Sequence, residues 1–232
     1  MMTTDKSSLT SGAGESDRSP VRSVQRALDL LGCFSEGRSN ITLSEAARLT
    51  DLPVSTVSRL LATLESAGFL RRTASGYACG TQLMQIGLSA LQNLSSFEIA
   101  EPHLIRLTEQ TGESSYLGIP GDDGRVMYVR QCLSQKSIRH SAWLGRTVPV
   151  QGTAIGAAIK GETGAAGFVA TRQTLEPDVT AIAAPIRGAD GSIVAAVNLT
   201  GPTYRIKDSD IDRFGRTVAA AATAISRELG AS

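Results

Sequence analysis

The sequence predicts an α+β protein in two parts, and three observations lead to this fold class. Up to about Gly80, apolar residues recur at helical spacing and are followed by two short strand-like segments. From about residue 96, strand-like segments come in pairs joined by turns that contain Asp-Gly, a strong local hairpin signal. Helical stretches stand at both ends of this second part. Such a pattern indicates an antiparallel sheet flanked by helices.

Length and composition are those of a soluble globular protein. The 232 residues suffice for two modest domains, and 41% hydrophobic with 19% charged residues is ordinary. Residues 1–20 are rich in Ser, Thr and Gly, without aromatic residues or an apolar run, so we expect a disordered tail and no secretory signal. No apolar run is long enough to span a membrane.

Charge and cysteine content narrow the function classes. The net charge is only +1, so binding to nucleic acid would depend on where individual cations stand. Cys33, Cys79 and Cys132 are odd in number and far apart. They predict neither a disulfide framework nor a metal site, and they fit the reducing cytoplasm.

Residues 21–80 predict three helices and a hairpin. The first helix spans about Val21 to Ser35, and a capping box at Thr42 and Glu45 opens the second, Leu43 to about Leu49. The apolar residues expected on one face of the first helix are Val24, Ala27, Leu28, Leu31 and Phe34.

After a tight turn, Pro53 is expected in the first turn of a third helix, which ends before Gly68. Val54, Val57, Leu61 and Leu64 fall on its apolar face. A hairpin of residues 69–73 and 76–79 follows. Three helices and a hairpin in this order make a winged helix-turn-helix.

The rest of the chain predicts a linker helix and then the sheet. Apolar residues of the stretch 81–95 spread around most of the helix, which suggests packing on another subunit or domain. The second part, 96–232, begins with a helix from about Ile99 to Gln110. Its expected hairpins are 114–119 with 125–132 and 180–186 with 192–199. A closing helix runs from Asp208, its expected N-cap, to about Leu229.

Seven segments, in order along the chain, resemble the IclR-type bacterial transcriptional regulators. Those in the first part are SVQRALDLL from Ser23, LPVSTVSRLL from Leu52 and LESAGFL from Leu64. Those in the second part are TGES from Thr111, PVQGTAIG from Pro149, IAAPI from Ile182 and VNLTGP from Val197. The resemblance extends from about residue 22 to the C-terminus.

The resemblance implies a winged-helix DNA-binding domain, a linker helix and a GAF-like effector-binding domain. It implies binding to double-stranded promoter DNA, as a repressor in our interpretation. A small metabolite, an organic acid or an aromatic compound, is expected to modulate that binding. Members form homodimers and often homotetramers. No cofactor is implied.

The third helix carries small hydroxyl residues where Lys and Glu are usual, and this favours DNA recognition. A helix in the major groove brings its backbone close to base edges, so short polar side chains fit there. Arg59 could contact a guanine or a phosphate, and one of the wing residues Arg71 and Arg72 is expected to reach DNA. A solvated charge without a partner remains the alternative for each cation. The expected DNA-binding residues are Arg22, Arg26, Ser55, Thr56, Ser58, Arg59, Thr63, Arg71 and Arg72.

A second group of residues is expected at a ligand pocket. Gly152, Thr153 and Ala154 precede a helix, where backbone amides could hold a carboxylate. Asn198 and Thr200 share one face of a strand, which by resemblance faces the pocket. Alternatively, Thr153 is only an N-cap and Asn198 only a sheet residue whose hydrogen bonds are satisfied. Looser candidates for pocket walls are Tyr116, Tyr128, Arg130, Arg139 and Trp143.

The chain departs from the resembled family in one place. Only about Ala157 to Val179 remains where a longer helical segment usually closes the pocket, and we find no match for an acidic pocket residue that some members carry there. The hypothesis is a more open pocket or a reduced effector role. A regulator whose second part only oligomerises is therefore the alternative.

An enzyme is the remaining class. The chain has two histidines, His103, on a helix and expected to make a surface or linker contact, and His140, expected on a strand. No catalytic, phosphate-binding or dinucleotide-binding fingerprint occurs. A GAF-type redox enzyme would need paired cysteines, which the sequence lacks.

Overall fold

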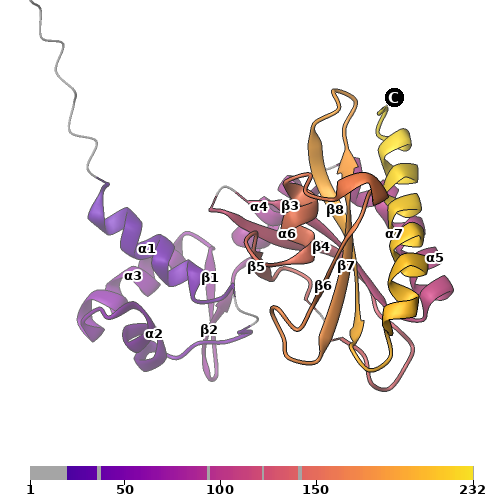
Figure 1. The fold of residues 1–232 in the computed structure, drawn as a ribbon. Helices are drawn as coiled ribbons and strands as arrows, with labels where there is room; N and C mark the ends of the chain where they lie inside the picture. Colours follow the sequence, from indigo (N-terminus) through magenta and orange to yellow (C-terminus); the bar gives the residue numbers. More distant parts are fainter. Residues whose placement is uncertain (1–19, 36–37, 93–94, 122, 141–142, 232) are drawn as a thin grey trace, which may run out of the picture.

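A computed structural model describes residues 20–35, 38–92, 95–121, 123–140 and 143–231. The expected disordered tail lies outside this part of the chain, except for Pro20. Figure 1 shows a small helical unit with a hairpin on one side and a larger sheet with helices on the other. The predicted α+β class is confirmed.

The helical unit has the predicted order of elements. A capping box opens its second helix, because Thr42 accepts from the Glu45 amide and the Glu45 carboxylate accepts from the Thr42 amide. Leu30, Val57, Leu61 and Leu70 form the centre of its core. The elements are α1 (Arg22–Gly32), α2 (Leu43–Thr50), α3 (Val54–Ser66), β1 (Leu70–Thr73) and β2 (Gly76–Cys79).

Three expectations for this unit were wrong in detail. Pro53 is the N-cap residue of α3 and not part of its first turn. Val54 is 54% exposed, because the first turn of α3 extends beyond the core that Val57 and Leu61 reach. Val24 and Leu28 are each 55% exposed, since α1 turns Leu30 inward instead.

Two helices join the units. The first is α4 (Thr81–Gln92), where Met84, Ile86 and Leu88 are about half exposed or more. The second is α5 (Ser95–Thr111), which begins four residues earlier than expected and has Pro102 inside it. Within the described residues, no helix is both long and apolar enough to cross a membrane.

The larger unit is built on a six-stranded antiparallel sheet of order β5-β4-β3-β8-β7-β6. Both predicted hairpins are present, β3 with β4 and β7 with β8. The two edge strands were not predicted. The strands are β3 (Ser114–Pro120), β4 (Arg125–Cys132), β5 (Thr147–Pro149), β6 (Val169–Arg172), β7 (Val179–Arg187) and β8 (Ile193–Pro202).

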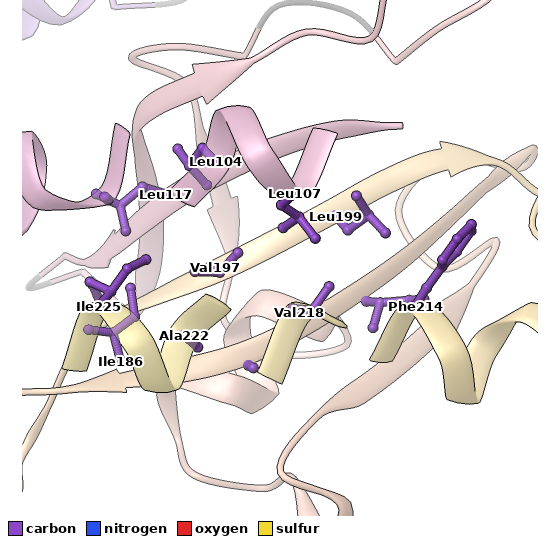
Figure 2. Close-up of a cluster of buried hydrophobic side chains, with 14 of the residues drawn as sticks. Leu104, Leu107, Leu117, Ile186, Val197, Leu199, Phe214, Val218, Ala222 and Ile225 are labelled. Atoms are coloured by element: carbon purple, nitrogen blue, oxygen red, sulfur yellow. The ribbon is translucent and has the colours of Figure 1, made fainter. Parts of the chain in front are cut away.

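Alternation along the strands separates two cores. Leu117, Ile182 and Val197 face α5 and α7, where Figure 2 shows leucine, valine and phenylalanine side chains meeting between the helices and the sheet. Their neighbours Ala183 and Ala196 face the opposite side, covered by α6 (Ala154–Ile159). A short 3₁₀ helix, Gly164–Ala166, follows α6. The ligand residues expected on β8 belong to the α6 side.

The closing helix α7 (Asp208–Glu228) is present, but its cap differs from the expectation. Lys207 is the N-cap residue, and the Asp210 carboxylate accepts from the Lys207 amide at 3.2 Å. Asp208 instead pairs with Arg172 of β6 at 2.7 Å. Phe214, Val218, Ala222 and Ile225, which lie on one face of α7, are buried.

Candidate DNA interface and ligand cavity

The polar face of α3 is exposed because the opposite face is fixed in the core. Val57, Leu61 and Leu64 are buried at helical spacing. Thr56 is half-buried, and the other polar residues of this face are exposed: Ser55, Ser58, Arg59 and Thr63. The helix thus offers a continuous polar surface.

Arg59 is the one cation on this surface of α3. Its guanidinium has no hydrogen-bond or ion-pair partner among the described residues. The Thr63 hydroxyl donates to the Arg59 carbonyl at 3.0 Å, so its proton is engaged within the helix. Arg22 and Arg26, near the start of α1, are exposed as well.

The two wing arginines have different surroundings. The Arg72 guanidinium lies over the Tyr77 ring at 5.1 Å, donates to the Tyr77 hydroxyl and stands 3.8 Å from Glu65. Arg71 is exposed, and its side chain has no recorded partner in the described part of the chain. Arg71 is thus the wing arginine without a partner in this part of the structure, whereas Arg72, with a side chain 67% exposed, is held against Tyr77.

Asn40 fixes the wing turn, a role that sequence reasoning missed. Its Nδ2 donates to the Ser75 carbonyl at 2.8 Å, and its Oδ1 accepts from the Thr73 hydroxyl at 2.8 Å. No local pattern indicates such a contact, because Asn40 is more than thirty residues away from Thr73 and Ser75.

In the larger unit, a small cavity lies between the sheet, α6 and two loops. Asn198 and Thr200 line it, as do Thr153, Ala154, Tyr128 and Trp143. The Asn198 amide group donates from Nδ2 to the Tyr128 hydroxyl at 2.8 Å. Its Oδ1 is buried and has no hydrogen-bond partner among the described residues. A buried polar atom in this state favours a bound polar group.

The start of α6 is a structural cap. The Thr153 hydroxyl accepts from the Gly156 amide at 3.1 Å and donates to the Pro149 carbonyl at 2.7 Å. Gly152 is exposed and does not line the cavity. With six residues, α6 is too short for us to assign an anion site to its amides.

Four aromatic rings stand together here: Tyr128, His140 and Trp143 line the cavity, whereas Tyr116, also expected at the pocket, does not. Tyr116 and Tyr128 have ring centroids 5.3 Å apart, and Trp143 lies 5.6 Å from Tyr128 and 4.6 Å from His140. Burial raises the pKa of Tyr116 to about 12 and raises that of Tyr128 further. Burial also lowers the pKa of His140, which keeps this ring neutral at pH 7.

The expectation that His140 lies on a strand was wrong. It belongs to the loop between β4 and β5, and its Nδ1 forms a hydrogen bond of 2.9 Å with the Tyr116 hydroxyl. Strand pairing ends at Cys132, and ring contacts rather than a ladder hold His140.

A buried ion cluster anchors this loop. Glu113, 2% exposed, pairs with Arg205 through two hydrogen bonds and with Lys136 at 3.0 Å. Arg205 also donates to the Ile138 carbonyl at 2.9 Å. Nearer the end of the same loop, the Trp143 amide donates to Oε1 of Gln131 on β4 at 2.9 Å. These contacts fix where His140 and Trp143 lie.

An acidic residue that the sequence analysis did not identify, Glu176, also lines the cavity. Glu176, in the loop between β6 and β7, places Oε2 3.5 Å from His140 Nε2. Arg130 does not line the cavity, because it pairs with Glu101 of α5 at 3.0 Å. Arg139 is exposed and donates to the Lys136 carbonyl.

Two family profiles match most of the chain. The IclR helix-turn-helix domain matches residues 23–74, and the bacterial transcriptional regulator IclR C-terminal domain matches residues 88–161 and 161–227. The chain belongs to the IclR family. The C-terminal match breaks at residue 161, within the stretch where the sequence departs from the resembled family.

Curated relatives of this IclR-family chain are transcriptional regulators. The regulator XynR of Escherichia coli is 25% identical over 90% of this chain and 98% of its own length. The transcriptional repressor IclR of Escherichia coli is 25% identical over 90% of each chain. The chain is accordingly a transcriptional regulator, and not one of the enzymes considered as alternatives.

Solved structures share the fold. An IclR homologue from Microbacterium hydrocarbonoxydans, complexed with 4-hydroxybenzoate, has a TM-score of 0.77 at 21% identity and covers 90% of this chain and 100% of its own. IclR of Thermotoga maritima has a TM-score of 0.69 at 21% identity and covers 91% of this chain and 100% of its own.

In this IclR-family chain His103 is structural, since its Nε2 lies 2.8 Å from Glu228 of α7.

Proposed function

We propose that this IclR-family regulator binds double-stranded promoter DNA in the cytoplasm and represses transcription until a small organic molecule enters the cavity beside α6. The observation that carries the DNA-binding half is the exposed polar face of α3, with an unpartnered Arg59, next to the exposed Arg71 of the wing. Ser55 and Ser58 keep the surface around Arg59 low enough for close approach to base edges.

The cavity supports the effector half of the proposal. Thr153, Asn198 and Thr200 of its polar lining are buried, and Asn198 retains an atom without a partner. The expected ligand class is an organic acid or an aromatic compound, and the three aromatic rings that line the cavity favour the latter. The cavity is small, and the hypothesis of a more open pocket or a reduced effector role stays a prediction.

Oligomerisation without a ligand is the second candidate for the larger unit. Outside that unit, exposed apolar residues at the start of α1, on α1 and on α4 favour a homodimer or a homotetramer whether or not a ligand binds. They are Val21, Val24, Leu28, Met84, Ile86 and Leu88. A broad metabolite screen on the full chain separates the candidates: saturable binding supports an effector site, and no thermal shift with any compound supports oligomerisation alone.

Footprinting on the upstream region of the protein's own gene tests the DNA-binding half. Protection of a defined site would support operator recognition. If the protein covers all sequences equally, the proposed regulation loses its basis. A reporter gene placed behind the protected site would then show repression if the proposal holds, and activation would contradict that part of it.

Arg59→Ala is expected to weaken operator binding by about 10- to 100-fold, as removal of a base contact does. Non-specific binding should fall by only about twofold, because the variant loses one positive charge near the DNA phosphates. Titration of labelled operator and scrambled duplexes at fixed salt measures both. Arg216→Ala on α7, an exposed arginine far from α3, serves as the control. Equal losses on both duplexes would make Arg59 a phosphate contact instead.

The wing predicts different results for two adjacent arginines. Arg71→Ala should weaken binding to all sequences and reduce the slope of log affinity against log salt by about 0.9, the share of one phosphate contact. Arg72→Ala should leave the slope unchanged, because its guanidinium is already engaged with Tyr77 and Glu65. Salt titrations of both variants decide the assignment, and the reverse pattern would assign the DNA contact to Arg72.

A further inference from the structure

The charge of the cavity lining is unusual for a site that would hold an acid. Glu176 carries the formal charge of the described lining, which includes neither lysine nor arginine. His140 is held neutral by burial. The Tyr116 hydroxyl and His140 Nδ1 share a hydrogen bond of 2.9 Å, and His140 Nε2 lies 3.5 Å from the Glu176 carboxylate.

Nearby cations do not replace a charge inside the cavity. Arg139 and Arg146 act on the ring cluster electrostatically, yet both are exposed and neither belongs to the lining. Arg139 donates to a backbone carbonyl, that of Lys136. Solvent and salt screen exposed charges of this kind. The Glu176 side chain is 42% exposed too, but it is part of the lining and lies 3.5 Å from His140.

The cavity is also too small to admit a hydrated anion. The free volume between the lining side chains is about 30 Å³, room for about two water molecules. A ligand must displace the side chains of the loops and shed its own water. For a carboxylate this desolvation is costly without a counter-charge, and the carboxylate of Glu176 would add repulsion.

The same lining suits a cation. Aromatic faces carry the negative part of the ring quadrupole and attract ammonium groups, most strongly when these are desolvated. Three rings that line the cavity, those of Tyr128, His140 and Trp143, stand beside the carboxylate of Glu176. Whichever way the Asn198 amide group is turned, one of its polar atoms bonds Tyr128 and the other remains for the ligand.

We propose that the effector of this regulator is a small organic amine, bound as its ammonium ion between Glu176 and the aromatic rings of the cavity. The inference rests on the proposed function, and it replaces the organic acid considered there with a cationic ligand, which the aromatic alternative admits. The carboxylate of Glu176 sets this selectivity by charge, and the rings add a contact that an acid cannot make.

Three probes of nearly equal size test the charge directly: benzylamine, benzyl alcohol and benzoate. Calorimetric titration of the full chain is expected to give benzylamine about tenfold tighter binding than benzyl alcohol, and benzoate weaker binding than either. Glu176→Gln should lower benzylamine affinity by about tenfold and leave benzyl alcohol within about twofold. Unchanged alcohol binding also shows that the variant keeps its cavity.

The matched control is Asp178→Asn, in the same loop but outside the lining, which should change neither affinity. Benzoate binding tighter than benzylamine would overturn the proposal and leave the proposed effector site standing. Equal losses of benzylamine affinity in Glu176→Gln and Asp178→Asn would overturn it too, since the effect would then come from long-range charge and not from a contact in the cavity. If none of the three probes binds, the amine proposal fails, and the metabolite screen decides separately whether the effector site exists.

Discussion

Glu113→Gln is expected to lower the free energy of unfolding by about 3 kcal/mol, the cost of breaking a buried ion pair. The carboxylate is 2% exposed and accepts from both Arg205 and Lys136. Without its charge, the guanidinium of Arg205, with a side chain 22% exposed, keeps its desolvation cost and loses its counter-ion. Lys136, with a side chain 43% exposed, contributes little because solvent screens it.

Urea denaturation followed by Trp143 fluorescence measures this change, since Trp143 is the one tryptophan of the chain and lies in the anchored loop. The control is Glu101→Gln, which removes an exposed pair with Arg130 and should cost less than about 1 kcal/mol. Comparable losses in the two variants would show that the buried cluster contributes no more than a surface pair. The loop carrying His140 would then need another anchor.

The fold could be predicted where side chains mark the ends of elements. Thr42 and Glu45 bond reciprocally at the start of α2, and Gly68 adopts the positive φ that ends α3. The edge strands β5 and β6, three and four residues long, carry no such signal. They are strands because β4 and β7 pair with them, which is information from distant parts of the chain.

The sequence predicted cavity residues on the sheet, at the start of α6 and, with Trp143, in one loop, but it missed His140 and Glu176. Asn198 and Thr200 share a face through the two-residue period of a strand, and both line the cavity. His140 and Glu176 come from two loops, and no period places a loop residue. Their meeting depends on the contacts of Glu113, just before the start of β3, because Arg205 bonds both Glu113 and the Ile138 carbonyl of the loop that carries His140.

The wing shows the same limit on the DNA side. Alternation along β1 correctly separates Arg71 from Arg72, but it does not say which one is free. Tyr77, on the paired strand β2, decides this by engaging Arg72. Whether each arginine is solvated or bonded is therefore decided by tertiary contacts, which the local sequence does not show.

Gly156→Ala is expected to lower the free energy of unfolding by about 3 kcal/mol, at the upper end of the range for overpacking. A Cβ at this position would clash with the backbone of Val150, the nearest atom being its carbonyl oxygen at 1.8 Å. Backbone cannot rotate away as a side chain can, so α6 must move. The Gly156 amide bonds the Thr153 hydroxyl, and that cap would be disturbed together with the helix.

The displacement of α6 should also reach the cavity, because Ala154 and Ile155 line it. Thermal and urea unfolding measure the stability loss, and titration with the best ligand of the screen measures the effect on the cavity. The control is Gly32→Ala at the end of α1, where a Cβ meets nothing within 4 Å, so its stability change should stay within about 0.5 kcal/mol. If Gly156→Ala unfolds like the control, the turn from Val150 into α6 yields easily, and α6 does not rigidly define the cavity wall.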